Sequence, residues 1–460
     1  MQRLKAISPI DGRYHEKTEI LSQFFSEEAL IKYRIIIEGE YLLGLSNTPG
    51  VGLRKFSAKE KNIIRTLSNL KEKDISRVKE IEAATNHDVK AIEYFIKEKL
   101  KKTTLSDSLE WIHFALTSED TNNMSYALML SDSLAQVILP VLEEINAKME
   151  NFAVKNKAVV AIARTHGQAA SPTTIGKEFK VFAARLARQI KQLKNFKIQA
   201  KLNGATGNYN AHRAAYPKVN WMRFTETFVA GFNTSRKVKL KTNLITTQIE
   251  SHDTYAELFS IMQRINTILI DFDQDIWRYI SDNWIIQKLK KGEVGSSTMP
   301  HKVNPIDFEN SEGNLGIANV LFSFFANKLP ISRLQRDLSD STVERNFGVA
   351  LAHSLIAYKS ILKGLEKINL NYKKMAEEVE NHPEVVAEAI QTILRREKYP
   401  IPYEQLKELT RGKKCTLQDF EKFINGLHIS KKIKQELHST APQNYTGIAE
   451  KLAILNKSDL

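Results

Sequence analysis

Two long stretches of this chain lack the residues that usually end helices. Glycine is absent from Arg54 to His166, a stretch in which Pro140 is the single proline, and no proline occurs between Pro217 and Pro300. Because Gly and Pro are the main helix breakers, their absence over such lengths predicts long helices.

The apolar residues within and near these stretches recur at helical spacing. One series comprises Tyr255, Leu258, Phe259, Met262, Ile265, Leu269, Phe272, Ile276 and Ile280. A second series comprises Phe179, Phe182, Leu186, Ile190 and Leu193. Such spacing predicts one-sided helices that pack into a bundle, so we interpret both series as core and not as cofactor-binding boxes. The sequence therefore predicts an all-α fold.

We expect three zones along the chain. They are an N-terminal, mostly helical domain at 1–116, a central long-helix bundle at 117–364 and a C-terminal helical domain at 365–460. Prolines and Gly412 divide the last zone into short charged helices. Strand signals are scarce, and the best candidate, 238–249, could equally be an extended loop.

The net charge of +14 raises the question of a nucleic-acid partner. The lysines are interleaved with acids, as in KEKDISRVKEIE, and the basic runs lack the interleaved aromatic residues of a stacking surface. We therefore expect no nucleic-acid partner. A basic surface also suits a small polyanionic substrate, because a positive field raises its encounter rate.

The N-terminal sequence, the apolar runs and the cysteine content indicate the cellular compartment. The N-terminus, MQRLKAISPIDGRY, lacks the apolar run of a secretory leader, and no stretch approaches the uninterrupted apolar length that a membrane span requires. The single cysteine, Cys415, cannot form an intramolecular disulfide, which fits a reducing compartment. We expect a cytoplasmic protein without a membrane partner.

One segment is built unlike any helix: GEVGSSTMPHKVNP, at 292–305. Gly292 and Gly295 permit unusual backbone angles, whereas Pro300 and Pro305 fix φ and remove N–H donors. A flexible entry followed by a stiff exit is typical of a mobile active-site loop.

The same segment resembles the signature of the fumarase/aspartase superfamily, GSSxMPxKxNP, at every fixed position. The resemblance implies a three-domain fold with a central helix bundle and a β-elimination that releases fumarate. It also implies that Ser296 is the base that removes the carbon-bound proton, and that Lys302, Asn304 and Asn310 bind substrate.

The segment RTHGQ at 164–168 places a histidine at a break in a helical region. Histidine is well suited to donate a proton near neutral pH, although a lone histidine is more often a structural hydrogen-bonding residue. The sequences THGQ and SPTTIGKE resemble the adenylosuccinate lyase family within the superfamily. That resemblance implies that His166 is the general acid.

Two further segments have both a structural and a functional interpretation, and a third has a functional one. TNHDVK at 85–90 and TSED at 117–120 could be helix caps, with Thr85 or Asn86 capping the first. Both segments also resemble the adenylosuccinate lyase family, as does TTQIE at 246–250. The resemblance implies that the nucleotide and the succinyl group are bound by Asn86, His87, Asp88, Thr117, Ser118 and Gln248.

A phosphate group favours arginine, whose planar fork pairs with oxyanions at two points. DGRY at 11–14 and RDLSDSTVER at 336–345 carry such arginines, and either could be a surface turn with ordinary ion pairs. Both resemble the phosphate-binding segments of the same family. The resemblance implies binding roles for Arg13, Tyr14, Arg336, Ser341 and Arg345.

No metal or cofactor is expected, because zinc-spaced His and Glu pairs and a strand-following GxGxxG are lacking. The resemblance implies cleavage of adenylosuccinate to AMP and fumarate, and of succinylaminoimidazole carboxamide ribotide to its carboxamide, in purine synthesis. It also implies a homotetramer with shared active sites. Alternatives are another fumarate-releasing lyase, such as argininosuccinate lyase or aspartase, and a basic helical nucleic-acid-binding protein. The nucleotide-type segments disfavour the first, and the second leaves every site motif unexplained.

Overall fold

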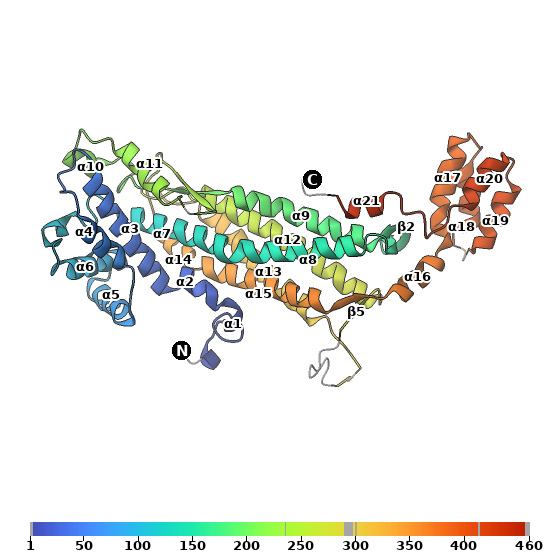
Figure 1. The fold of residues 1–460 in the computed structure, drawn as a ribbon, viewed down its shortest axis with the longest axis horizontal. Coiled ribbons are helices and arrows are strands. Elements are labelled where there is room, and N and C mark those ends of the chain that lie inside the picture. The colour runs from blue at the N-terminus through green and yellow to red at the C-terminus, as the bar shows by residue number, and fades with distance from the viewer. Residues whose placement is uncertain (1–2, 235, 289–297, 300, 413–414, 456–460) are drawn as a thin grey trace. The chain divides into compact units, whose positions relative to one another are not determined.

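The computed structural model of the protein describes residues 3–234, 236–288, 298–299, 301–412 and 415–455. These residues are mainly helical (Figure 1), which confirms the predicted all-α class. The helices are α1 (His15–Thr18), α2 (Ser22–Phe25), α3 (Glu27–Asn47), α4 (Ala58–Thr66), α5 (Glu72–Thr85), α6 (Asp88–Leu100), α7 (Ser118–Ser133), α8 (Leu139–Lys155), α9 (Ile175–Asn195), α10 (Asn210–Ala215), α11 (Trp221–Gly231), α12 (Asp253–Ser281), α13 (Ile306–Lys328), α14 (Ser339–Glu344), α15 (Phe347–Lys367), α16 (Tyr372–Glu380), α17 (Ala387–Arg396), α18 (Pro402–Thr410), α19 (Leu417–Gly426), α20 (Lys431–His438) and α21 (Ala449–Ala453).

The described strands form three two-stranded pairs. They are β1 (Val160–Thr165) with β2 (Gln168–Thr174), β3 (Lys197–Ala200) with β4 (Lys239–Thr242), and β5 (Ile285–Gln287) with β6 (Ile368–Leu370). The β3–β4 pair is parallel and the other two are antiparallel. The strand candidate at 238–249 thus contains β4, and the rest of it is loop.

The contacts divide the chain into two compact units that are interleaved in sequence. The first comprises Met1–Leu142, Gln189–Thr267 and Ser311–Lys359, and the second comprises Glu143–Arg188, Ile268–Asn310 and Ser360–Leu460. Each unit therefore draws on three separate stretches of chain. The three zones expected from the sequence stay a prediction.

The long-helix prediction is confirmed at α12, which runs for 29 residues. Every member of the series from Tyr255 to Ile276 is buried, and only Ile280 is partly exposed. A one-sided apolar pattern therefore becomes the buried face of this helix, as the spacing predicts.

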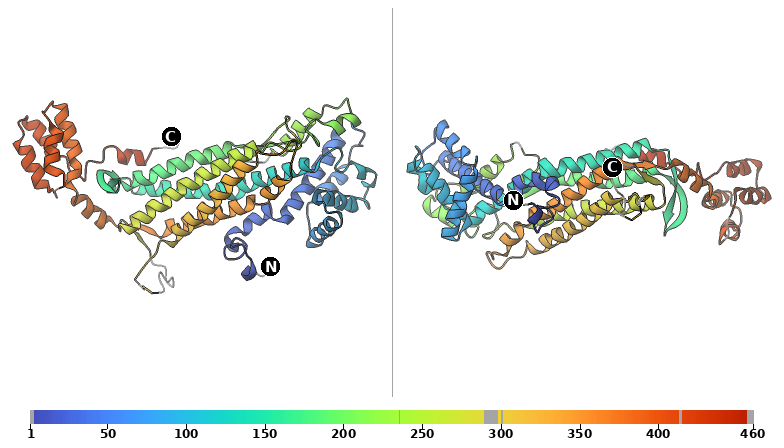
Figure 2. Two further views of the ribbon diagram at one scale, coloured as in Figure 1. Left: turned by 180° about the vertical axis from the view of Figure 1, so that it is seen from behind. Right: turned by 90° about the horizontal axis from the view of Figure 1, so that it is seen from below.

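In the first unit, α3 and α7 lie against each other and are buried on most sides (Figures 1 and 2). Helix α3 begins where Ser26 accepts a 3.1 Å hydrogen bond from the Ala29 N–H, with Glu27 and Glu28 in the positively polarised first turn. Fourteen of the sixteen residues of α7 are buried, among them six polar residues in its first eight positions. The polar start of α7 must therefore find partners inside the protein.

A helix run from Ser118 to Lys155 is long and apolar enough to cross a membrane, which the sequence analysis did not anticipate. The most apolar window of this run is 72% buried inside the protein. A burial of that extent is typical of a core helix in a soluble protein.

In the second unit, α17 to α20 lie together (Figure 1) and share a small buried core with residues of β1 and α16. It includes Ile390, Leu394, Leu406, Phe420 and Ile424, all buried. The only cysteine, Cys415, is buried beside them and donates a 3.1 Å hydrogen bond to the Leu409 carbonyl.

Helices α13 and α15 approach closely at Gly364. A β-carbon added there would lie 2.6 Å from the ring of Phe308, which is itself buried and cannot move away freely. We expect Gly364→Ala to destabilise the protein by about 1–3 kcal/mol through overpacking, measured as a lower midpoint of thermal unfolding. Gly426→Ala is the matched control, because nothing lies within 4 Å of the added carbon. Equal midpoints for the two variants would contradict the close approach.

Candidate functional site

A polar cavity of about 520 Å³ in the first unit gathers residues from three separate stretches of chain. Its lining comprises Lys79, Glu82, Ala83, Asn86, His87, Asp88, Ser118, Asn122, Arg336, Leu338, Ser341 and Arg345. Seven of these are site residues predicted from the sequence: Asn86, His87, Asp88, Ser118, Arg336, Ser341 and Arg345. The fold thus brings together segments that lie more than 200 residues apart.

The junction of α5 and α6 supplies one wall. Asn86 adopts the left-handed conformation at φ 50°, which asparagine tolerates better than most residues, and so ends α5. His87 caps α6, because its Nδ1 accepts a 3.1 Å hydrogen bond from the Lys90 N–H. The expectation that Thr85 or Asn86 caps α6 is therefore wrong, since the chain reverses at Asn86 and leaves His87 in the extended cap position.

Asp88 is fixed by two arginines. It lies 2.6 Å from Arg34, which is nearly fully buried, and 3.1 Å from Arg345. Burial alone would raise the pKa of Asp88, but the charge and hydrogen bond of Arg34 outweigh it and hold that pKa below its usual range. Asp88 is therefore a carboxylate at neutral pH, and it orients Arg345 at the cavity wall.

The N-terminus of α7 supplies the second wall. Thr117 is the N-cap residue, and its N–H donates a 3.0 Å hydrogen bond to Asp120. Ser118 opens the helix and lines the cavity. Because the first turn of a helix carries unpaired N–H groups and a partial positive charge, this end of α7 favours an anionic ligand.

Asp120 forms an ion pair that is closed to solvent. Its carboxylate lies 2.9 Å from Lys201 Nζ, and both side chains are 0% exposed. Asp120 also accepts hydrogen bonds from the N–H groups of Asn203 and Gly204. The pair therefore ties the start of α7 to the loop after β3.

The stretch before and within α14 supplies the third wall. Arg336 pairs with Glu119 at 2.9 Å and with Asp340 at 3.1 Å, and its side chain is 12% exposed. Asp340 also accepts a 2.6 Å hydrogen bond from the Ser341 N–H. These contacts fix the arginine and the serine that face the cavity. Three cationic and two acidic side chains line the cavity, which gives it a positive balance.

Four predicted residues of the first unit are absent from the cavity lining: Arg13, Tyr14, Thr117 and Gln248. The Arg13 guanidinium lies over the Tyr14 ring at 5.9 Å. Gln248 donates a 3.2 Å hydrogen bond to the Ala205 carbonyl.

The other predicted residues belong to the second unit or are not described. His166 lies at the tip of the β1–β2 hairpin, where it and Gly167 have φ of 53° and 74°. Positive φ at both central residues is the geometry of a two-residue hairpin turn, and it leaves His166 exposed. Lys302 and Asn304 precede α13, and Asn310 accepts a 3.0 Å hydrogen bond from Ser360. Ser296 lies outside the described residues.

The sequence analysis missed several residues of the lining, including Lys79, Glu82 and Asn122. Asn122 accepts a 2.9 Å hydrogen bond from the Nε of Arg34. It lies four residues after Ser118 on one helix, so helical spacing could have placed both on the same face. Lys79 and Glu82 of α5 lie seven and four residues before Asn86. This spacing also places them on the same face of the helix as Asn86.

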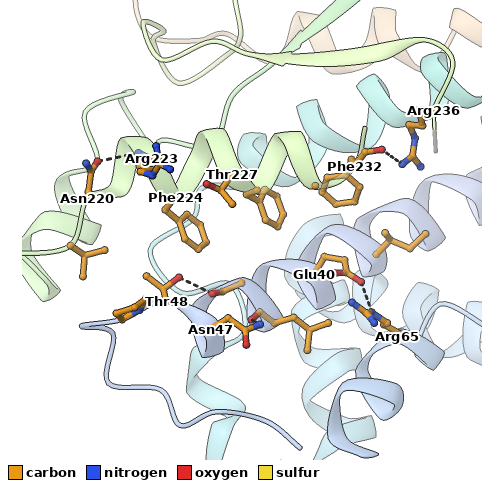
Figure 3. A pocket seen from close by; sticks show the side chains of 17 residues that line it. Glu40, Asn47, Thr48, Arg65, Asn220, Arg223, Phe224, Thr227, Phe232 and Arg236 are labelled. Carbon is orange, nitrogen blue, oxygen red and sulfur yellow. Dashed lines mark hydrogen bonds and ion pairs between the residues drawn. The ribbon is translucent and has the colours of Figure 1, made fainter. Parts of the chain in front are cut away.

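A larger cavity of about 980 Å³ lies between α3 and α11 (Figure 3) and contains none of the predicted site residues. Phe224, Phe228 and Phe232 line it at intervals of one helical turn. Two of its arginines are already paired, Arg65 with Glu40 and Arg236 with Asp132. The predicted site residues that line a cavity therefore all belong to the smaller one.

Among the described residues, one group has the composition of a metal site: Glu119, His252 and Glu344. All three are buried, and their ligand atoms lie within 4.8 Å of one another. The sequence could not indicate this group, because its members are far apart along the chain.

Two family models match most of the chain. Residues 12–321 match a model described as lyase, and residues 332–446 match one described as adenylosuccinate lyase C-terminal. The chain is 50% identical to an adenylosuccinate lyase of Legionella pneumophila (strain Corby), over 98% of each chain. It is 48% identical to that of Escherichia coli (strain K12), also over 98% of each, and 50% identical to that of Dictyostelium discoideum, over 97% of each.

Two solved structures share the fold at low sequence identity. One is a 3-carboxy-cis,cis-muconate lactonizing enzyme from Pseudomonas putida, with a TM-score of 0.71 and 17% identity, covering 95% of each chain. The other is a fumarate lyase from Mesorhizobium sp. BNC1, with a TM-score of 0.72 and 15% identity, covering 95% of this chain and 96% of the other. The predicted fumarase/aspartase-like fold is confirmed.

The Asp120–Lys201 pair gives a test of what holds the cavity wall. Lys201→Met leaves a carboxylate in the interior without its cation, so we expect a loss of about 3–5 kcal/mol in stability, seen as a lower midpoint of thermal unfolding. The double variant Lys201→Met/Asp120→Asn should recover part of the loss. Arg77→Met, which breaks the exposed pair with Glu98, should leave the midpoint almost unchanged, because solvent screens exposed ion pairs. Equal shifts for Lys201→Met and Arg77→Met would contradict a stabilising role for the buried pair.

Proposed function

Because the chain belongs to the adenylosuccinate lyase family and has the activity of that family, we propose that its polar cavity binds the nucleotide part of adenylosuccinate. The reaction is the elimination of fumarate from adenylosuccinate, which leaves AMP. We extend the proposal to succinylaminoimidazole carboxamide ribotide, which carries the same succinyl group and phosphate.

The observation that carries the proposal is the convergence of seven predicted residues on one cavity. Arg336 and Arg345 supply charged forks for the phosphate, and Ser341 supplies a hydroxyl between them in sequence. Ser118 at the N-terminus of α7 suits a carboxylate of the succinyl group, with Thr117 beside it. Asn86 and His87 offer polar groups for the base and ribose. Arg13, Tyr14 and Gln248 are assigned to substrate by the resemblance alone.

The chemistry requires a base and an acid on opposite faces of the substrate. A proton alpha to a carboxylate is weakly acidic, so the charge that develops there needs prepositioned donors. We assign the base to Ser296 and propose that loop N–H groups and Lys302 stabilise its alkoxide as the loop closes and water leaves. Asn304 and Asn310 complete the substrate contacts of this region.

We assign proton donation to the departing nitrogen to His166. Its exposed position at a hairpin tip keeps the imidazole accessible to a ligand. Its positive φ supports the assignment, since sparsely populated backbone conformations cluster at functional sites.

We further propose a homotetramer in which several subunits contribute to each active site. An apolar stripe on α13 supports self-association: Ile317, Val320 and Phe324 are 50%, 70% and 51% exposed and lie three to four residues apart. Assembly would also bring His166 and Ser296 to a cavity formed by other segments. The enzyme acts in the cytoplasm on small nucleotides, without a nucleic-acid or membrane partner.

The two proton carriers are tested by following adenylosuccinate absorbance without added metal or cofactor. We expect Ser296→Ala and His166→Ala to lower kcat by roughly 10²–10⁴-fold, because each removes a proton-transfer group, while KM changes little. Unchanged kcat in either variant would contradict that residue's role. A wild type that cleaves argininosuccinate or aspartate, but not adenylosuccinate, would refute the substrate assignment.

The phosphate role is tested by a pair of substrates. Arg345→Ala should lower kcat/KM for adenylosuccinate by about 10–100-fold, the value of a charged hydrogen bond, mainly through KM. The same variant should act like the wild type on succinyladenosine, which lacks the phosphate. An equal loss with both substrates would show that Arg345 acts elsewhere. Arg77→Ala, at an exposed pair, is the control.

A further inference from the structure

Three buried side chains beside the cavity have no part in the proposed chemistry. Glu119 of α7, His252 before α12 and Glu344 at the end of α14 are each at most 1% exposed. Glu119 Oε1, His252 Nε2 and Glu344 Oε1 have no hydrogen-bond partner within the described part of the chain, and the three groups face one another within 4.8 Å. Buried polar atoms of this kind need a physical explanation.

The hydrogen bonds of His252 fix its tautomer. Its Nδ1 lies 3.3 Å from the Leu329 carbonyl, which can only accept, so Nδ1 carries the hydrogen. In a neutral imidazole, Nε2 is then an acceptor. Nε2 lies 3.5 Å from Glu344 Oε1, and a carboxylate is also an acceptor. Two acceptors facing each other away from water are unfavourable unless one proton lies between them.

The surroundings place that proton on Glu344. Burial, followed by the charges of Glu119 and Asp340, raises the pKa of Glu344 well above its usual range. Burial lowers the pKa of His252, although the charge of Glu250 opposes this effect. The raised pKa of Glu344 and the lowered pKa of His252 both favour a neutral carboxyl group that donates a hydrogen bond to a neutral imidazole.

We propose that Glu344 is a positioning residue that is protonated at neutral pH and whose O–H donates a hydrogen bond to His252 Nε2. Because the neutral carboxyl group adds no negative charge beside Arg336, the guanidinium keeps its attraction for an anionic ligand. The inference rests on the proposed function in that Arg336 is assigned there to the phosphate.

The charge balance around Arg336 explains why the proton matters. Arg336 already pairs with two carboxylates, Glu119 at 2.9 Å and Asp340 at 3.1 Å. An ionised Glu344 would add a third negative charge to the same buried region and weaken the attraction for a phosphate. The charged and titratable groups that face the cluster are Arg34, Glu119, Tyr126, Lys201, Glu250, His252, Tyr255, Arg336, Asp340 and Arg345.

A divalent metal ion is the competing occupant, because two carboxylates and an imidazole form a donor set that also suits zinc. The guanidinium of Arg336, 2.9 Å from Glu119, opposes a second cation there. A single proton satisfies the His252–Glu344 contact and leaves both groups neutral, whereas a divalent ion would add two positive charges beside the guanidinium. The geometry therefore favours a proton over a metal.

The test compares AMP binding at pH 7.5, by calorimetry, in the wild type, Glu344→Gln and Asp340→Asn. The glutamine amide can donate to His252 Nε2 and carries no charge, so we expect its Kd for AMP to stay within threefold of the wild type. Asp340→Asn removes the carboxylate that pairs with Arg336 at 3.1 Å and should change Kd by tenfold or more, which shows that the assay senses charge near Arg336. Glu344→Leu, neutral but without a donor, leaves His252 Nε2 buried and unpaired, so we expect a lower midpoint of thermal unfolding than in Glu344→Gln; equal midpoints would contradict the hydrogen bond to His252.

Infrared spectroscopy at pH 8.5 provides a readout that does not depend on AMP. We expect a protonated-carboxyl band in the wild type that is lost in Glu344→Gln; at this pH Glu119, whose pKa burial raises to about 7, is largely ionised. Absence of the band, tenfold tighter AMP binding by Glu344→Gln, or a stoichiometric divalent metal that is lost in His252→Gln would overturn the proposal. If the wild type does not bind AMP but shows the band, the proposed function fails while the proton assignment survives.

Discussion

The fold around the cavity depends on the burial of a polar helix start. The first eight residues of α7 include six buried polar side chains, and a buried polar group without a partner costs about 1–3 kcal/mol. These partners therefore come from other segments of the chain. Thr121 donates to Glu38 of α3, Asn122 accepts from Arg34 of α3, and Asp120 pairs with Lys201 after β3. The buried polar side chains of α7 need hydrogen-bond and ion-pair partners, and this requirement holds α3 and the loop after β3 against the start of the helix.

The same requirement organises the charges of the site. The arginines that face the cavity, Arg336 and Arg345, are held by acids that are themselves buried or half-buried. An arginine fixed in this way loses little conformational freedom when a ligand binds, which favours affinity. The negative charges of these acids also lower the positive potential in the cavity. The protonation state of each nearby carboxyl group therefore affects what the cavity can bind.

Local sequence patterns predicted the helices well and the strands poorly. The spacing from Tyr255 to Ile276 gave the buried face of α12, because helical periodicity depends only on near neighbours. The β1–β2 hairpin was missed, since its strands are short and rich in small residues, and its turn uses His166 and Gly167 in left-handed conformations. The cap of α6 was placed one or two residues early, because the reversal at Asn86 is not visible in a capping pattern.

The site was predictable mainly by resemblance. Seven motif residues do converge on one cavity, whereas composition and spacing alone could not have joined Asn86 to Arg345 across the chain. Neither the family resemblance nor the residue spacing predicted the Glu119–His252–Glu344 cluster, because the residues next to each of the three in the sequence form no metal-binding or catalytic motif. The cluster can be recognised only in the structure, where three separate segments bring their acceptor atoms within 4.8 Å of one another.

The interleaving of the two units has a consequence for synthesis on the ribosome. The first unit needs residues 311–359 as well as 1–142, so its N-terminal helices emerge long before their last partners. At typical translation rates of about 5–20 residues per second, the wait lasts roughly 10–40 s. During that time the apolar part of the helix run from Ser118 to Lys155 lacks its last partners, and exposed apolar surface of this kind is what chaperones bind.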